Sequence, residues 1–185
     1  MFDRTGNRKY LNWPEREAFF RAVGKEPDPF KRTLCLTLFY TGCRISEALN
    51  LRWEQIDFSG QALVFESLKR RKRGHFRSVP IPATLVKEIG DLDIPTGSDG
   101  RIWAVSRPTA YRWIKAKMLE ARLEGPKASP KGLRHSYAIA CISRNVPLTV
   151  VKKWLGHARL ETTAIYLDVI GEEERELAKR LWRTS

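Results

Sequence analysis

Apolar side chains recur every three to four residues along most of the chain, which is the spacing of amphipathic helices. The clearest helix start is at Asn12, which is followed by Pro14 and, three residues after the asparagine, by Glu15. This is the arrangement of a capping box, with proline in the first turn. The pattern predicts a helix that continues to about Gly24.

The same spacing predicts helices through the rest of the chain. From Phe30 onwards it is interrupted at Thr41 and Gly42, so two short helices are expected to meet there at a tight corner. Later helices are expected at residues 85–92, 107–123, 133–144, 149–155, 161–168 and 172–182.

Between Trp53 and Pro82 the apolar period changes towards two, which is typical of strands. Residues 62–65 and 77–81 are the candidate strands, on either side of a basic turn. The predicted fold class is therefore mainly α with a small antiparallel β-sheet (α+β). No repeat or long linker divides the sequence, so residues 1–185 are expected to form a single domain, with no room for a separate N-terminal DNA-binding domain.

The net charge of the chain indicates which class of partner it binds. The chain has 34 Lys and Arg against 21 Asp and Glu, a net charge of +13, which favours a polyanion. No apolar run approaches the roughly 18 to 20 residues of a membrane-spanning helix. No secretory signal follows Met1, and a cytoplasmic protein that binds nucleic acid is expected.

Cysteine usage argues against a metal centre or a disulfide framework. Cys35, Cys43 and Cys141 are widely spaced and lie within apolar helical patterns, so they are interpreted as buried thiols. No Cys-x-x-Cys, His-Glu-x-x-His or glycine-rich phosphate loop is present in the sequence. No metal and no cofactor are expected, and phosphate chemistry would have to rest on side chains.

A basic run at residues 69–77 has six Lys or Arg in nine positions and no acidic residue. In a turn between strands these cations would lie along a DNA backbone, although a solvated charge run is the alternative. The predicted DNA contacts are Lys69, Arg70, Arg71, Arg73 and Arg77. Lys72 could reach further, as a proton donor.

Two helix starts offer further cations. Arg44 lies just after the glycine corner, where its guanidinium could bind a phosphate through two N–H groups. A structural ion pair with Glu47, three residues later, is weighed equally at this point. The start of the helix at 107, with Arg107 and Arg112, either contacts DNA or forms a solvated face.

The most specific pattern lies in the last third of the chain. Arg134-His135, Leu155-Gly156-His157 and Tyr166 follow one another at short, defined intervals. Together with Thr41-Gly42-Cys43-Arg44 and the basic run, this series resembles the catalytic domain of the tyrosine recombinase (phage integrase) family over nearly the whole chain. That resemblance implies the catalytic-domain fold of the family.

The resemblance also implies site residues and a reaction. Five positions match in order and spacing, namely Arg44, Lys72, Arg134, His157 and Tyr166. Tyr166 would attack a DNA phosphate without metal to give a 3′-phosphotyrosine, and Lys72 would protonate the leaving 5′ oxygen. The family's first histidine before the arginine is Lys131 here; phosphate contact is carried over to it, and its part in proton transfer is left open. His135 is left out of the catalytic set, because it could simply orient Arg134.

The implied enzyme is a site-specific DNA recombinase that acts on double-stranded DNA and assembles as a homo-oligomer there. The segment 172–185 would be a helix that either closes its own domain or docks on a neighbouring subunit. The alternatives are a catalytically silent DNA-binding accessory protein, a type IB topoisomerase-like nicking and closing enzyme, and a helix-turn-helix regulator, which explains the charge but not the motifs.

Overall fold

The computed structural model describes residues 1–66, 75–93 and 99–167. In this part of the chain the helices are α1 (Trp13–Gly24), α2 (Pro29–Thr41), α3 (Ile45–Leu49), the 3-10 helix η1 (Trp53–Gln55), α4 (Ala83–Gly90), α5 (Arg107–Glu120), α6 (Pro130–Ser143), α7 (Leu148–Leu155) and α8 (Glu161–Ala164). The strands are β1 (Ile56–Asp57), β2 (Ala62–Glu66) and β3 (Phe76–Pro80). The predicted class, mainly helical with a small antiparallel sheet, is confirmed.

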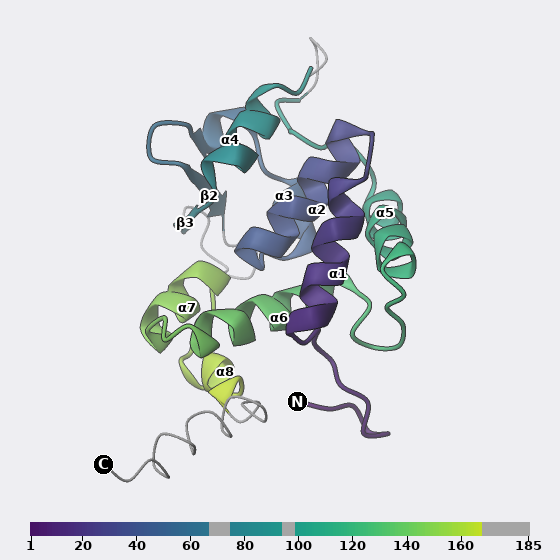
Figure 1. The fold of residues 1–185 in the computed structure, drawn as a ribbon. Coiled ribbons are helices and arrows are strands. Elements are labelled where there is room, and N and C mark those ends of the chain that lie inside the picture. The colour runs from purple at the N-terminus through teal and green to yellow at the C-terminus, as the bar shows by residue number, and fades with distance from the viewer. Residues whose placement is uncertain (67–74, 94–98, 168–185) are drawn as a thin grey trace, which may run out of the picture.

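The helices α1 and α2 pack side by side at the centre (Figure 1). The sheet and α4 lie on one side of them and α5 on the other, while α6, α7 and α8 form a group at the lower end of the view. Since α6 contacts α2 and α7 contacts β3, this C-terminal group is joined to both the central helices and the sheet.

Side-chain caps fix the starts of the first two helices. The side chain of Asn12 accepts a hydrogen bond from the amide of Glu15, and the Glu15 carboxylate accepts one from the amide of Asn12, so the predicted capping box is present. Asp28 caps α2 by accepting hydrogen bonds from the amides of Phe30 and Lys31.

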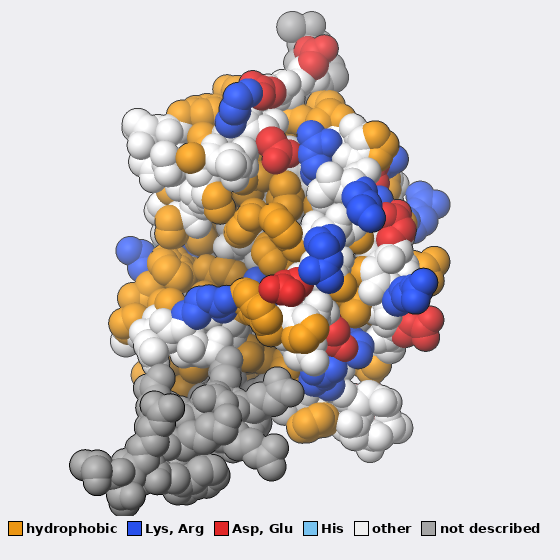
Figure 2. All heavy atoms as spheres, in the orientation of Figure 1, with side chains coloured by type: hydrophobic (Ala, Val, Ile, Leu, Met, Phe, Trp, Pro, Cys, Tyr) orange, Lys and Arg blue, Asp and Glu red, His pale blue; other side chains and the backbone are white. Residues whose placement is uncertain are grey.

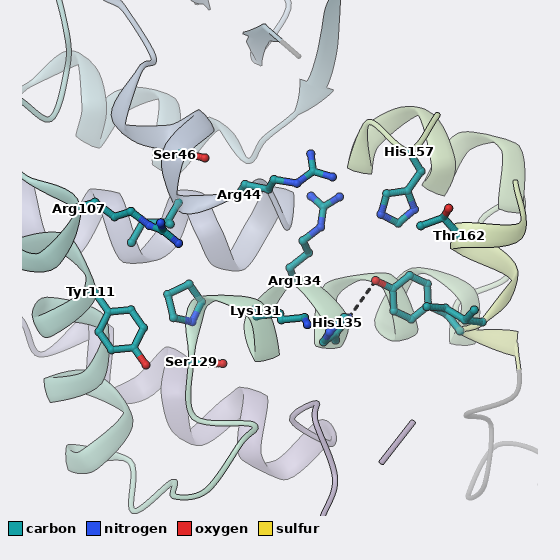
Figure 3. Close-up of a pocket in the computed structure, with 14 residues that line it drawn as sticks. Arg44, Ser46, Arg107, Tyr111, Ser129, Lys131, Arg134, His135, His157 and Thr162 are labelled. Atoms are coloured by element: carbon teal, nitrogen blue, oxygen red, sulfur yellow. Dashed lines mark hydrogen bonds between the residues drawn. The ribbon is translucent and has the colours of Figure 1, made fainter. Parts of the chain in front are cut away.

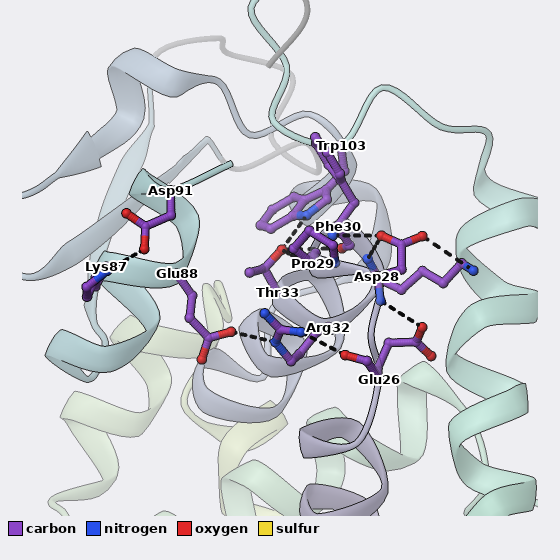
Figure 4. Close-up of polar contacts among 11 residues, drawn as sticks. Glu26, Asp28, Pro29, Phe30, Arg32, Thr33, Lys87, Glu88, Asp91 and Trp103 are labelled. Carbon is purple, nitrogen blue, oxygen red and sulfur yellow. Dashed lines mark hydrogen bonds and ion pairs between the residues drawn. The ribbon is translucent and has the colours of Figure 1, made fainter. Parts of the chain in front are cut away.

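Polar contacts around α2 connect it to its neighbours (Figure 4). Arg32 donates from Nη1 to the carbonyl of Glu26, at 2.7 Å, and from Nε to the carboxylate of Glu88 on α4, at 2.8 Å. The buried indole of Trp103 donates to the hydroxyl of Thr33. These contacts hold α2 at a defined position, and the glycine corner that follows its last residue is positioned with it.

The corner after α2 matches the prediction. Gly42 has a left-handed φ of 58°, which ends α2 and redirects the chain into α3. A Cβ atom at this position would collide with the ring of Tyr137 on α6. Only glycine therefore allows both the turn and the close approach of α6.

The sheet has the strand order β1-β2-β3, with both pairs antiparallel. Leu63 on β2 is paired with Val79 on β3, and both side chains are fully buried. The two longer strands agree with the predicted ones, whereas the two-residue strand β1 was not predicted.

Two clusters of apolar side chains form the interior. The larger unites α1–α5, the sheet and the start of α6, and the smaller unites α6, α7 and the segment that contains Tyr166. All three cysteines are buried free thiols, as predicted. No helix within the described ranges is both long and apolar enough to cross a membrane.

On the face shown in Figure 2, apolar side chains gather near the middle, and blue cations and red anions alternate on the right-hand side. This face therefore does not present a continuous basic surface.

Candidate active site

Five of the six predicted catalytic residues line one cavity of about 570 Å³. They are Arg44, Lys131, Arg134, His157 and Tyr166. The cavity lies between α3, α5, the start of α6 and the segment from α7 through α8 (Figure 3). Lys72, the sixth, lies outside the described residues, as do Lys69, Arg70, Arg71 and Arg73.

Arg44 immediately precedes α3 and lines the cavity, where its guanidinium lies close to that of Arg134 in Figure 3. Its Nη1 donates to Oε1 of Glu47 at 2.8 Å, so the ion pair that the sequence left open does form. The arginine side chain nevertheless remains 26% exposed. The ion pair therefore orients Arg44 at the cavity without enclosing it.

Arg77 was expected to contact DNA, and that contact stays a prediction. Its side chain is 6% exposed and pairs with Glu47, with Nη2 and Oε2 2.7 Å apart. Its Nε donates to the carbonyl of Trp154 on α7, and its guanidinium lies over the ring of Phe65. Because Arg77 points to the buried face of β3, it joins the sheet to α3 and α7.

Glu47 is consequently the buried carboxylate of the site. Burial opposes its ionisation, but Arg77 and Arg44 outweigh that effect and hold the pKa of Glu47 below its usual value. The carboxylate thus stays charged and holds two arginines from different elements.

Arg134 lies on α6 and is 7% exposed. Its Nη1 donates to the carbonyl of Gly42 at 2.8 Å, and its Nη2 donates to the carbonyl of Leu155 at 2.7 Å. Burial and then the nearby Arg44 lower the pKa of Arg134 to about 10, so the guanidinium remains charged at neutral pH. The Arg134 guanidinium is therefore fixed between the corner at Gly42 and the end of α7 at Leu155.

His157 follows Gly156, whose left-handed φ of 68° ends α7. The Nδ1 atom of His157 lies 2.9 Å from the hydroxyl of Thr163 on α8. Burial, followed by the charge of Arg134, lowers the pKa of His157 to about 4. The imidazole is therefore neutral near pH 7.

Tyr166 follows α8 and is 2% exposed. Burial raises the pKa of its phenol, although Arg134 and Arg44 act in the opposite direction. The ring stacks on that of His157 with centroids 6.3 Å apart, and the hydroxyl lies 3.0 Å from Nδ1 of His135. The phenol is thus protonated and held at the cavity by two histidines.

Nine of the fourteen residues that line the cavity were not in the predicted catalytic set, among them His135, Arg107 and Tyr111. His135 was set aside as a residue that could orient Arg134, yet its contact is with Tyr166. Arg107 and Tyr111 on α5 form the wall opposite His157 and Thr162 (Figure 3). The cationic start of this helix was the available signal in the sequence, but only the packing of α5 places it at the cavity.

Lys131 is exposed in the first turn of α6 and lines the cavity. Within the described ranges no group of three or more His, Cys, Asp or Glu side chains is arranged to hold a metal ion. The chemistry that this arrangement offers is binding of a phosphate by arginine and lysine beside a tyrosine hydroxyl.

Comparison with known proteins agrees with this arrangement. Residues 10–173 match the family described as the phage integrase family. The chain belongs to this family. Among curated relatives, a tyrosine recombinase of Thermosipho africanus is 34% identical over 178 residues, which cover 93% of this chain and 61% of the relative. The chain spans about half the length of several other curated relatives.

Solved structures of recombinases share the fold. A crystal structure of XerA recombinase has a TM-score of 0.79 and 24% identity, covering 95% of this chain and 65% of that one. A pre-cleavage complex of the XerH site-specific recombinase with its difH substrate has a TM-score of 0.73 and 20% identity, covering 89% and 55%. The family and the catalytic-domain fold that the motifs implied are therefore confirmed.

Proposed function

We propose that this chain is a site-specific DNA recombinase that cleaves and rejoins strands of double-stranded DNA through a covalent bond to Tyr166. The observation that supports this most strongly is the single cavity in which the Tyr166 hydroxyl lies with two arginines, Arg44 and Arg134. Its relatives are named tyrosine recombinases, and the XerH structure holds a DNA substrate.

In the proposed reaction, Arg44 and Arg134 bind the non-bridging oxygens of the scissile phosphate and stabilise the charge that develops on them. Lys131, in the first turn of α6, adds a further donor to the phosphate. The Tyr166 oxygen attacks phosphorus, the bond to the 5′ oxygen breaks, and a 3′-phosphotyrosine forms. Lys72 protonates the leaving 5′ oxygen, and attack by a 5′-hydroxyl reverses the sequence and joins the strand.

His157 has a supporting role in this mechanism. Its neutral ring is fixed through Nδ1 by the Thr163 hydroxyl and stacks on Tyr166. Its other nitrogen can donate to a phosphate oxygen in the tautomer that carries the proton there.

The proposals on domain organisation, location and oligomeric state rest on the sequence. Residues 1–185 act as one catalytic domain, in the cytoplasm, on a duplex held by the basic run at 69–73. The protein is a monomer in solution and a homo-oligomer on DNA, where the helix at 172–185, outside the described residues, docks on a neighbouring subunit. Sedimentation with and without duplex DNA tests the change of state.

Covalent trapping tests the reaction. The protein is incubated with a nicked suicide duplex in EDTA, beside Tyr166→Phe, and a DNA-shifted protein band is sought on a denaturing gel. The band is expected from the wild type and not from the variant, whose affinity for DNA should be unchanged. A band that persists in the variant would exclude Tyr166 as nucleophile, and binding without any band would favour the silent accessory protein.

The products distinguish the remaining alternative. Relaxation of a supercoiled plasmid that has no second site would indicate a type IB topoisomerase-like enzyme, whereas products that join two sites indicate recombination.

A further inference from the structure

The hydroxyl of Tyr166 has a direct partner on α6. Its oxygen lies 3.0 Å from Nδ1 of His135, and the two residues are 2% and 8% exposed (Figure 3). The imidazole and phenol rings are tilted by 55°, so the contact is edge-on at the nitrogen and not a stack of the two rings. A buried imidazole nitrogen is thus within hydrogen-bonding distance of the proton that has to leave when Tyr166 attacks.

The other groups of the cavity are less suited to take that proton. A lysine ammonium has three donors and no acceptor, and an arginine remains charged in a protein. His157 uses Nδ1 for the Thr163 hydroxyl and presents its ring face to the ring of Tyr166. His135 is the neutral acceptor that contacts the phenol.

We propose that His135 is the general base of strand cleavage; this rests on the proposed function above. As the Tyr166 oxygen forms its bond to phosphorus, its proton passes to Nδ1 of His135, and the electron pair of the broken P–O5′ bond leaves with the 5′ oxygen. His135 becomes an imidazolium with a proton on each nitrogen. It returns this proton to the phenol when the 5′-hydroxyl attacks and Tyr166 is released.

The surroundings of His135 keep it ready to accept. Burial is the main cause that lowers the pKa of His135, to about 4, and the charges of Lys131 and Arg134 on α6 and of Lys9 and the Met1 amino group add to it. Two uncharged groups also face it, the phenol of Tyr166 and the imidazole of His157. The negative charge of a phosphate bound at Arg134 would offset the positive charges around His135. Binding of the substrate would therefore raise the proton affinity of His135 before Tyr166 attacks.

The test is single-turnover cleavage of the suicide duplex by His135→Asn. The asparagine oxygen can replace Nδ1 as hydrogen-bond acceptor but cannot take a proton. The rate of covalent capture should fall about 10²–10⁴-fold, with DNA affinity and the far-UV spectrum unchanged. The wild-type rate should decline on the acid side as His135 takes up a proton, and that decline should be shallower in the variant, in which only His157 of the two buried histidines remains.

A substrate with sulfur in place of the bridging 5′ oxygen distinguishes the general base, which takes the proton of Tyr166, from the general acid, which protonates the leaving group. Its leaving thiolate needs no proton, so it should restore cleavage by Lys72→Ala but not by His135→Asn. Restoration of His135→Asn would place this residue on the leaving-group side and overturn the proposal.

A measurement on the unaltered protein does not depend on how the variant folds. Nitrogen-15 NMR of the labelled histidines should show His135 with its proton on Nε2 and with Nδ1 unprotonated. A proton on Nδ1 would overturn the base role. Wild-type or faster capture by His135→Asn would do so as well, and would leave the nucleophile assignment intact, since that depends on Tyr166→Phe alone.

Discussion

At the scale of single residues, Glu47 determines how the cations of the site are arranged. Its carboxylate pairs with Arg44 at the cavity and with Arg77 under the sheet, and its own side chain is 1% exposed. Arg44, which precedes α3, and Arg77, on β3, therefore both depend on the buried charge of Glu47. The free-energy cost of burying the Glu47 carboxylate is offset only while these arginines are present.

We expect Glu47→Gln to lower the free energy of unfolding by about 3 kcal/mol or more, because it leaves the buried Arg77 without a counter-charge. Urea unfolding followed by circular dichroism measures this. Glu17→Gln is the matched control, since Glu17 is 49% exposed and lies 3.7 Å from Arg21, and its effect should be close to zero. Equal stability of the two variants would contradict the structural role of Glu47.

The two buried histidines predict a pH dependence of stability. Folding lowers the pKa of both His135 and His157 to about 4, below the ordinary value of 6.5. Between these values the unfolded chain binds more protons than the folded one, so stability is full above about pH 6.5 and is lost as the pH falls towards 4. Each histidine contributes a slope of at most about 1.4 kcal/mol per pH unit.

Urea unfolding at a series of pH values measures this slope. It should be smaller in His157→Gln and unchanged in His75→Gln, whose side chain is exposed. A wild-type stability that is flat from pH 7 to pH 5 would contradict the buried, neutral state of the histidines.

The site could be predicted from sequence where its residues belong to a spaced series, as Arg44, Arg134 and Tyr166 do. It could not be predicted where a side chain depends on packing between distant elements. Alternation along β3 decides that Arg77 points inwards, and the approach of α6 to the segment after α8 brings His135 to Tyr166. Neither contact has a signature within a short stretch of sequence.

At the scale of elements, the corner between α2 and α3 links backbone conformation to chemistry. Gly42 adopts a left-handed conformation against the ring of Tyr137, and its carbonyl accepts a hydrogen bond from Arg134. A change in the corner would therefore move an arginine that lies on another helix.

We expect Gly42→Ala to destabilise the protein by more than the roughly 1 kcal/mol that a left-handed alanine costs, because the new methyl group also meets Tyr137. Covalent capture should fall with it. Gly125→Ala is the control, because Gly125 has a φ of 73° with open space around it and should show the backbone cost alone. Thermal unfolding and the trapping assay would measure both, and equal losses in the two variants would contradict the close packing.

Most elements could be predicted because they are long enough to show a period. The capping box of α1 and the corner at Gly42 are confirmed. The strand β1 has two residues and no detectable period. The helix α8 ends at Ala164, and the last residue of its predicted range, Asp168, lies outside the described residues. The predicted helix at 172–182 lies outside the described residues.

At the scale of the whole molecule, the net charge of +13 predicts DNA affinity that depends steeply on salt. Replacing Lys69, Arg70, Arg71 and Arg73 with glutamine should make the slope of log affinity against log salt shallower by about 0.9 for each phosphate that the variant no longer neutralises. Fluorescence anisotropy with labelled duplex at several salt concentrations measures this. The matched control replaces Arg4, Arg21, Lys25 and Lys87, which lie outside the cavity and the basic run.

Equal changes in slope for the two sets would indicate that binding follows total charge and not the basic run. A slope near zero in the wild type would argue against phosphate binding altogether.

The two hydrogen bonds of Arg134 have a consequence for how activity disappears on unfolding. They join the carbonyl of Gly42 to that of Leu155, so two segments more than a hundred residues apart in the sequence meet at one guanidinium. Release of either segment would free the arginine before the cavity itself had dispersed. On heating, the proposed DNA cleavage should therefore disappear no later than the first cooperative loss of tertiary structure.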